Sequence, residues 1–213
     1  MEIVSYAITA ALAYLLGSIP TGFIVAQLKG VDIRAVGSGN IGATNVLRAL
    51  GKPAGILVLF VDMLKGWLAV VVLTRLVLLA FGLARNGTTL EAAEIIAGAA
   101  AILGHNYTCW LQFKGGKGIA TSAGVLLALV PWALLIIAAI WTSVCMATRY
   151  VSLASVAASA ALPFASWLTR ESLTRVIVTA AMAVLAIYKH KGNIRRLLDG
   201  TEPRFGQKAE ETK

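Results

Sequence analysis

The sequence has few charged residues and few groups that bind metals or form disulfides. Only 14% of its 213 residues are charged, 58% are hydrophobic, and it contains two histidines and two cysteines. Soluble domains carry about 25% charged residues, so this chain lacks the charge to cover a water-facing surface. The two cysteines, Cys109 and Cys145, do not form the tight clusters of a disulfide framework or a zinc site. We therefore predict an all-α integral membrane protein with no metal and no cofactor.

Long apolar runs make the membrane prediction specific. The longest stretches that are nearly free of charge are residues 3–28, 53–80, 131–148 and 151–168. Crossing a bilayer takes about 20 apolar residues, because the hydrocarbon core is roughly 30 Å thick. A cleaved signal peptide would carry positive charge before its apolar run. Here Glu2 precedes the run and the first cation, Lys29, follows it, so we predict a retained first helix with its N-terminus outside.

The apolar pattern predicts about seven transmembrane helices. They are expected at residues 3–28, 53–82, 91–108, the two parts of 119–148, 151–168 and 172–188. Residues 119–148 would form a helix of about 45 Å if unbroken, too long for an untilted span. Pro131 interrupts this run, so we predict a hairpin with a short first arm.

Positive charge orients the predicted helices. The net charge is +9, and cations gather in the loop 29–52, in the stretch 109–118 and in the tail from residue 189. Short loops rich in Lys and Arg stay in the cytoplasm, whereas the links near Arg85 and Arg170 carry less charge and are expected outside. We predict one transmembrane domain over residues 1–213 with a cytoplasmic C-terminus. The cations suit anionic lipid headgroups or anionic substrates; nucleic-acid binding does not fit so apolar a chain.

The first polar segment, motif 1, covers residues 37–48. It contains the letters of a dinucleotide-binding fingerprint, but that motif requires a preceding strand, whereas a membrane helix precedes it here. Glycines in such a loop let backbone N–H groups form an anion-binding nest, and an arginine grips phosphate with two parallel hydrogen bonds. The residues expected to bind an anion are Ser38, Gly39, Asn40, Gly42, Asn45 and Arg48. The alternative is an ordinary solvated turn.

The second polar segment, motif 2, covers residues 104–118 and ends in Gly-Gly-Lys-Gly. A Walker loop would have Ser or Thr after its lysine, but Gly118 follows Lys117. The turn is still suited to phosphate, with Gly116 supplying backbone and Lys117 supplying charge. The alternative is a membrane-entry loop with lysines that extend to the headgroups.

Further polar residues lie near the chain end and inside the second helix. His190 and Asn193 are three residues apart and so share a helical face, although a basic helix end that stops membrane insertion would look similar. Ser155 is either a phosphate ligand or a helix-packing residue. Asp62 and Lys65 sit inside a predicted span, where charges usually face a partner or a cavity. For this pair, structural support is favoured over catalysis.

The three polar segments together resemble the PlsY family of bacterial membrane acyl-phosphate:glycerol-3-phosphate acyltransferases. The run Gly-Ser-Gly-Asn-Ile-Gly-Ala-Thr-Asn with Arg48 is similar to the family's first motif, and Gly104-His105 through Gly-Gly-Lys-Gly-Ile-Ala-Thr is similar to its second. The segment from His190 to Glu202, motif 3 below, is similar to its third. The motifs occur in the family's order and cover nearly the whole chain.

The resemblance implies a reaction and a site. A fatty acyl group would pass from a long-chain acyl phosphate to the sn-1 hydroxyl of glycerol 3-phosphate, giving lysophosphatidic acid and phosphate, the first acylation of phospholipid synthesis. His190, Lys117, Arg48 and Asn193 would be catalytic. Ser38, Gly39, Asn40, Gly42, Asn45, Gly116 and Ser155 would bind substrate. The protein would be a multi-pass enzyme of the bacterial inner membrane, surrounded by lipids, with its active site facing the cytoplasm.

Two questions stay open at this point. The hydroxyl proton would go either to His190 or to a phosphate oxygen of the donor, and the resemblance favours the second route. Glycine-interrupted helices also mark transporters, so a transporter for a phosphorylated metabolite is the rival function. A lipid-binding scaffold without catalysis is a third possibility, but it does not require three phosphate-binding segments.

Overall fold

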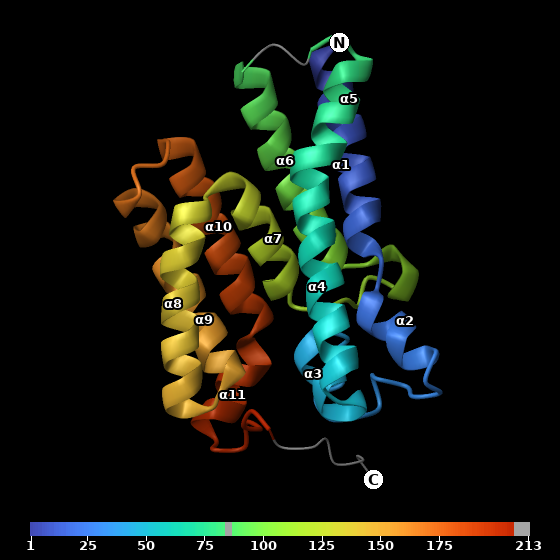
Figure 1. The fold of residues 1–213 in the computed structure, drawn as a ribbon, viewed down its shortest axis with the longest axis vertical. Coiled ribbons are helices and arrows are strands. Elements are labelled where there is room, and N and C mark those ends of the chain that lie inside the picture. The colour runs from blue at the N-terminus through green and yellow to red at the C-terminus, as the bar shows by residue number, and fades with distance from the viewer. Residues whose placement is uncertain (84–86, 207–213) are drawn as a thin grey trace. The chain divides into compact units, whose positions relative to one another are not determined.

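The computed structural model describes residues 1–83 and 87–206, which form helices joined by turns and by longer loops at residues 28–42 and 107–118 (Figure 1). The cations Arg85, Lys208 and Lys213 lie outside these described residues. The helices are α1 Glu2–Ser18, α2 Thr21–Gln27, α3 Ala43–Leu50, α4 Lys52–Leu68, α5 Thr74–Ala80, α6 Gly87–Asn106, α7 Ile119–Leu129, α8 Pro131–Thr148, α9 Val151–Leu168, α10 Leu173–Lys189 and α11 Lys191–Leu198, with a π-helical turn η1 Ala69–Leu73 and a 3-10 turn η2 Cys109–Leu111. The prediction of an all-helical protein is confirmed.

Several of these helices are suited to a membrane. Among the described residues, five segments are long and apolar enough to cross it: Glu2–Gln27, Lys52–Ala80, Gly87–Leu111, Pro131–Thr148 and Val151–Leu168. The bent pair Leu173–Lys189 and Lys191–Leu198 makes six if it is one span. Helix α7 has 11 residues and is about 17 Å long. Each predicted apolar segment is therefore mainly helical, although the first one is divided into α1 and α2. The count of seven crossings stays a prediction.

The described chain consists of two compact units, residues 1–129 and residues 130–206. In unit 1, helix α6 packs along α1 and α7 packs along α4. Close packing depends on small residues: a Cβ on Gly17 would overlap the backbone of Ala101, and a Cβ on Gly124 would overlap the backbone of Met63. Glycine lets helix backbones approach in a membrane, where contact and hydrogen bonding replace the hydrophobic effect.

The first predicted helix is divided near its end. Pro20 has no N–H to donate and disfavours helical backbone at the residue before it. Ile19 accordingly adopts φ −55° and ψ 112°, outside the helical range, and the chain restarts as α2 at Thr21. At the break, the carbonyl oxygens of Ser18 and Ile19 accept hydrogen bonds from the side chains of Thr108 and Lys65.

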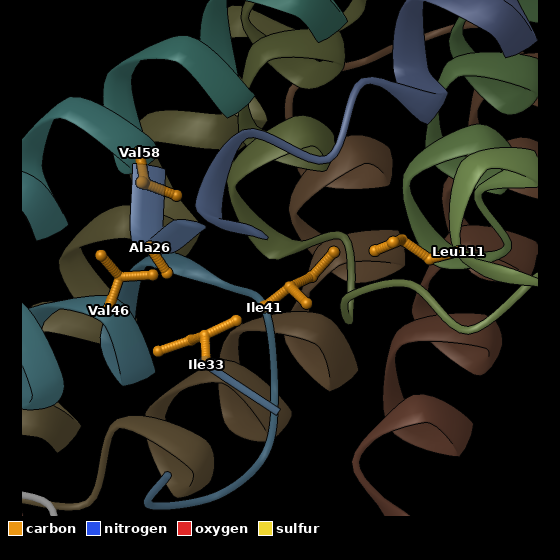
Figure 2. Close-up of a cluster of buried hydrophobic side chains, with 6 residues drawn as sticks. All are labelled: Ala26, Ile33, Ile41, Val46, Val58 and Leu111. Carbon is orange, nitrogen blue, oxygen red and sulfur yellow. The ribbon is translucent and has the colours of Figure 1, made fainter. Parts of the chain in front are cut away.

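The loop predicted at 29–52 contains helix α3. Its eight residues bury Asn45 and Val46, and Leu47 packs against the backbone at Gly55 of α4. Figure 2 shows the apolar cluster beside it, which joins Ala26 of α2, Ile33 and Ile41 of the loop, Val46 of α3, Val58 of α4 and Leu111 of η2. This cluster anchors motif 1 to the membrane helices of unit 1.

Unit 2 is formed by α8 to α11. Helix α9 contacts α8, α10 and α11, and α11 bends away from α10 by 56°. The predicted interruption at Pro131 is confirmed: α7 ends at Leu129, and Pro131 is the first residue of α8, a position where its missing N–H costs nothing.

Candidate functional site

Asn45 organises motif 1. Its side-chain amide donates to the carbonyl oxygens of Ile33 (3.1 Å) and Val36 (3.0 Å), and its Oδ1 accepts from the backbone N–H of Ser38 (3.0 Å). Asn45 itself is 2% exposed. Because these bonds use both amide hydrogens, Asn45 shapes the loop from inside.

The other motif 1 residues form the turn that leads into α3. The N–H of Gly42 donates to Asn40 Oδ1 (2.9 Å), and the N–H of Gly39 donates to the carbonyl of Val36 (3.1 Å). Gly39 has φ +66°, a conformation that glycine adopts without strain. Ser38 is exposed. Arg48 is half-buried in the last turn of α3. Motif 1 therefore presents the hydroxyl of Ser38 and the guanidinium of Arg48 from a loop that is held by internal hydrogen bonds.

The Gly-Gly-Lys-Gly turn of motif 2 is shaped by the end of α6. The N–H groups of Gly115 and Gly116 donate to the carbonyl oxygens of Asn106 (3.2 Å) and His105 (3.0 Å). A Cβ on Gly116 would overlap the His105 ring, and a Cβ on Gly115 would overlap the His105 carbonyl. The last carbonyls of a helix need donors, and this turn supplies them. The two glycines are therefore explained by their fit against α6.

Lys117 lies between Gly116 and Gly118, which are both buried, and is itself half-buried. Lys114, three residues earlier in the same motif, is exposed. Motif 2 therefore contains one partly buried lysine, Lys117, and one exposed lysine, Lys114.

A buried polar network reaches His105 of motif 2. Asp62 Oδ1 is 2.8 Å from Lys65 Nζ, accepts from Thr21 Oγ1 (3.0 Å) and is 3.7 Å from His105 Nδ1. Lys65 Nζ also donates to the carbonyl oxygen of Ile19 (2.8 Å). The ion pair predicted between Asp62 and Lys65 is present, and it connects α4 with the break between α1 and α2 and with α6.

Motif 3 lies in unit 2, at the bend between α10 and α11. His190 is 3% exposed, and its Nδ1 is 2.7 Å from the carbonyl oxygen of Ala186. A carbonyl oxygen only accepts, so the neutral ring carries its proton on Nδ1 and leaves Nε2 as a base. Asn193 donates to Glu202 Oε1 (2.7 Å), and Arg196 donates to Glu202 Oε2 (2.8 Å).

Glu202 is the organising residue of motif 3. Burial raises the pKa of its carboxyl, but hydrogen bonds from Asn193 and Arg196, with Ser152 acting in the same direction, outweigh burial and lower that pKa below its ordinary value. The resemblance includes Glu202 in motif 3, but its role was not predicted from the sequence. The signal that could have indicated it is a carboxylate six residues after Arg196 and nine after Asn193.

Ser155 is buried in α9, where its hydroxyl donates to the carbonyl oxygen of Val151 (2.8 Å) and accepts from Trp141 Nε1 (3.1 Å). A serine hydroxyl has one hydrogen to donate, and here that hydrogen goes to the preceding turn. Ser155 also joins α9 to α8 through Trp141.

The structure therefore places the predicted residues in two groups. Motifs 1 and 2 lie in unit 1, and Ser155, His190 and Asn193 lie in unit 2. Within residues 1–83 and 87–206, no three His, Cys, Asp or Glu side chains lie close enough together to hold a metal ion.

Sequence comparisons identify relatives over nearly the whole chain. The glycerol-3-phosphate acyltransferase family matches residues 7–200. A glycerol-3-phosphate acyltransferase of Geobacter sulfurreducens is 48% identical over 199 residues, which are 93% of this chain and 96% of that protein. One of Thermus thermophilus is 47% identical over 204 residues, 95% of this chain and 96% of that protein.

Solved structures agree with the sequence relatives. A crystal structure of PlsY, an integral membrane glycerol 3-phosphate acyltransferase, in its glycerol 3-phosphate form superposes with a TM-score of 0.83 at 40% identity, covering 95% of this chain and 96% of that one. The lysophosphatidic acid form gives a TM-score of 0.80 at 39% identity, with the same coverage. With a family match over residues 7–200 and these relatives, the chain belongs to the glycerol-3-phosphate acyltransferase family.

Proposed function

We propose that this protein transfers a long-chain acyl group from acyl phosphate to the sn-1 hydroxyl of glycerol 3-phosphate. The products are lysophosphatidic acid and inorganic phosphate. The observation that carries the proposal is the braced Gly-Gly-Lys-Gly turn, which presents half-buried Lys117 in a chain of this family. In an acyl phosphate the carbonyl is already activated and phosphate is a good leaving group, so no covalent enzyme intermediate is needed.

The chemistry requires positive charge and orientation. Both substrates are anionic and repel each other, and fixed cations offset this repulsion as they stabilise charge in the transition state. Lys117 and Arg48 supply that charge. Holding the hydroxyl and the acyl carbon together then contributes the proximity effect. Asn193 is proposed to orient glycerol 3-phosphate, with its amide held by Glu202.

The predicted substrate-binding residues divide into two kinds. Ser38 and Asn40 are proposed to contact phosphate through their side chains. Gly39, Gly42, Asn45, Gly116 and Ser155 donate their N–H or side-chain hydrogens to the chain itself, and we propose that they act by keeping the phosphate-binding loops and α9 in shape.

The proton of the attacking hydroxyl has two possible acceptors. With Nδ1 bound to the carbonyl oxygen of Ala186, His190 has an Nε2 lone pair suited to a general base. The donor phosphate oxygen is the other acceptor, and we propose this substrate-assisted route, with His190 binding and orienting glycerol 3-phosphate.

The membrane arrangement is also a proposal. We propose seven crossings of the bacterial inner membrane, with the N-terminus outside and with motifs 1 and 2 and the C-terminus in the cytoplasm, because the Lys and Arg residues gather in these segments. Single cysteines at exposed positions, in a chain whose Cys109 and Cys145 have been replaced, would be labelled in intact cells or in inverted vesicles. Labelling of a Lys114→Cys variant in intact cells by an impermeant reagent would contradict this orientation.

The enzymatic proposal is tested with purified protein in detergent. Glycerol 3-phosphate and palmitoyl phosphate are added, and phosphate and lysophosphatidic acid are measured together. One phosphate for each lysophosphatidic acid supports the proposal. Uptake of glycerol 3-phosphate into proteoliposomes without any lysophosphatidic acid would favour a transporter instead.

A further inference from the structure

Asp62 and Lys65 are unusual residues for the middle of a membrane helix. Their side chains are 2% and 4% exposed and lie 2.8 Å apart. Removing two charges from water costs several kcal/mol for each ion, and well-packed apolar residues often give equal or greater stability. Charged residues inside a span are therefore candidates for a role beyond stability.

The pair has partners that hold it in one geometry. Lys65 Nζ donates to the carbonyl oxygen of Ile19 at the break between α1 and α2, and Thr21, just after that break, donates to Asp62. The position of the Asp62 carboxylate is thus set from α2 and α4 together. Such multiple restraint is what a residue needs in order to orient another group.

The group next to this carboxylate is His105. Its Nδ1 is 3.7 Å from Asp62 Oδ1, and the side chain is 5% exposed. The opposite edge of the ring, at Nε2, lies where a Cβ of Gly116 would be, and the His105 carbonyl accepts from the Gly116 N–H. Both the ring and the backbone of His105 therefore contact Gly116, the residue before Lys117.

The end of α1 is bonded to the end of α6, which carries His105. Ser18 Oγ donates to the carbonyl oxygen of Gly104 (3.3 Å), Thr108 Oγ1 donates to that of Ser18 (2.5 Å), and Tyr14 donates to that of Tyr107 (2.7 Å). These bonds keep the end of α6 in place, and the buried Asp62 carboxylate faces Nδ1 of the His105 ring at 3.7 Å.

We propose that Asp62 and His105 are positioning residues for the motif 2 turn. Asp62, held by Lys65 and Thr21, sets the His105 ring, and the ring sets the Gly115–Gly118 backbone that presents Lys117 to a phosphate group. Neither residue touches substrate. The inference rests on the proposed function, because it concerns the phosphate that Lys117 binds.

The decisive variants separate positioning from stability. Asp62→Asn alone leaves Lys65 as a buried charge without its carboxylate and is expected to lower the melting temperature. Asp62→Asn with Lys65→Met removes both charges and is expected to restore the melting temperature. The apparent KM for glycerol 3-phosphate should nevertheless rise between about 10-fold and about 100-fold, because small displacements of a binding group cost about that much.

A second variant tests the ring while leaving the ion pair intact. His105→Phe keeps the bulk against Gly116 and removes the contact with Asp62, so it should raise the same KM. Combined with the Asp62 and Lys65 changes, it should add little, since residues in one chain of contacts have non-additive effects. Glu94→Gln is the control: it removes the Arg75–Glu94 ion pair between α5 and α6 (3.2 Å) in the same unit and should leave that KM unchanged.

The readouts keep this inference apart from the proposed function. Calorimetric binding of glycerol 3-phosphate is measured alongside acyl transfer. A wild-type protein without acyl transfer overturns the proposed function, while a weakened binding constant in the variants would still support positioning. Wild-type KM and binding constant in a folded His105→Phe protein, or in the double variant at restored melting temperature, would overturn the inference.

Discussion

Lys117 and Lys114 belong to the same motif but differ in burial, because Lys117 lies between two buried glycines and Lys114 is exposed. Replacing Lys117 with Ala should lower kcat/KM between about 100-fold and about 1000-fold, the effect of losing one group that stabilises transition-state charge. Lys114→Ala has the same charge change and should stay within about twofold of wild type. Steady-state rates of phosphate release check both variants, and equal losses in the two would contradict a specific role for Lys117.

His190 is the residue on which the two proton routes differ. In the substrate-assisted route His190→Ala raises KM for glycerol 3-phosphate and weakens its binding, because an orienting contact is lost. In the general-base route turnover falls between about 100-fold and about 10,000-fold at unchanged affinity. We expect the first pattern, measured by calorimetry and initial rates. Unchanged binding with lost turnover would establish His190 as the base.

At the scale of helices and turns, the contact between the Gly115–Gly118 turn and the end of α6 determines which side chains fit at position 116. An added methyl group on Gly116 would overlap the His105 ring, so Gly116→Ala should displace the turn and reduce acyl transfer at least about tenfold. The control is Gly87→Ala, where an added Cβ has no neighbour within 4 Å among the described residues. Transfer rates and melting temperatures of both variants are compared. A fully active Gly116→Ala enzyme would show that the turn tolerates displacement.

The segment after α11 is held by an ionised carboxylate. Because the pKa of Glu202 is lower in the folded protein than its ordinary value of 4.5, its stabilising effect is present above that value and is lost as the pH falls through the folded pKa. Glu202→Gln should therefore lower the melting temperature at neutral pH and flatten its decline in acid. Melting temperatures of the wild type and the variant, measured from neutral pH to below pH 4.5, check the prediction. Parallel curves of melting temperature against pH for the two proteins would contradict it.

The positions of the main helices could be predicted from sequence because apolar runs and Pro131 act locally. Helix α3 was missed, since motif 1 has the glycines and polar residues of a loop and its burial of Val46 depends on α2 and α4. The break at Ile19 was missed because Pro20 lies in an otherwise continuous apolar run.

The motifs could also be predicted, whereas the partners of single residues could not. Asn45, Gly116 and Ser155 have the residue types of phosphate ligands, yet their hydrogens go to backbone carbonyls that only the folded chain brings near. Asp62 and Lys65 could be paired from their spacing. Their link to His105 could not, because it joins helices that are far apart in the sequence.

At the scale of the whole molecule, the chain combines an apolar helical body with polar motifs at loops and helix ends. The exposed hydrophobic side chains of α4 and α8, such as Phe60 and Leu135, are typical of a lipid-facing surface, since a soluble protein does not expose so many. In the proposed reaction, the acyl chain would remain among lipid tails while its phosphate end reaches a motif loop. This arrangement suits an enzyme that joins a lipid to a water-soluble phosphate ester.

The most direct test of this account compares acyl donors in one preparation. Purified protein receives glycerol 3-phosphate with either palmitoyl phosphate or a palmitoyl thioester, and lysophosphatidic acid is followed over time. We expect product only from palmitoyl phosphate, with one phosphate released for each lysophosphatidic acid formed. Equal or faster product formation from the thioester would contradict the acyl-phosphate mechanism.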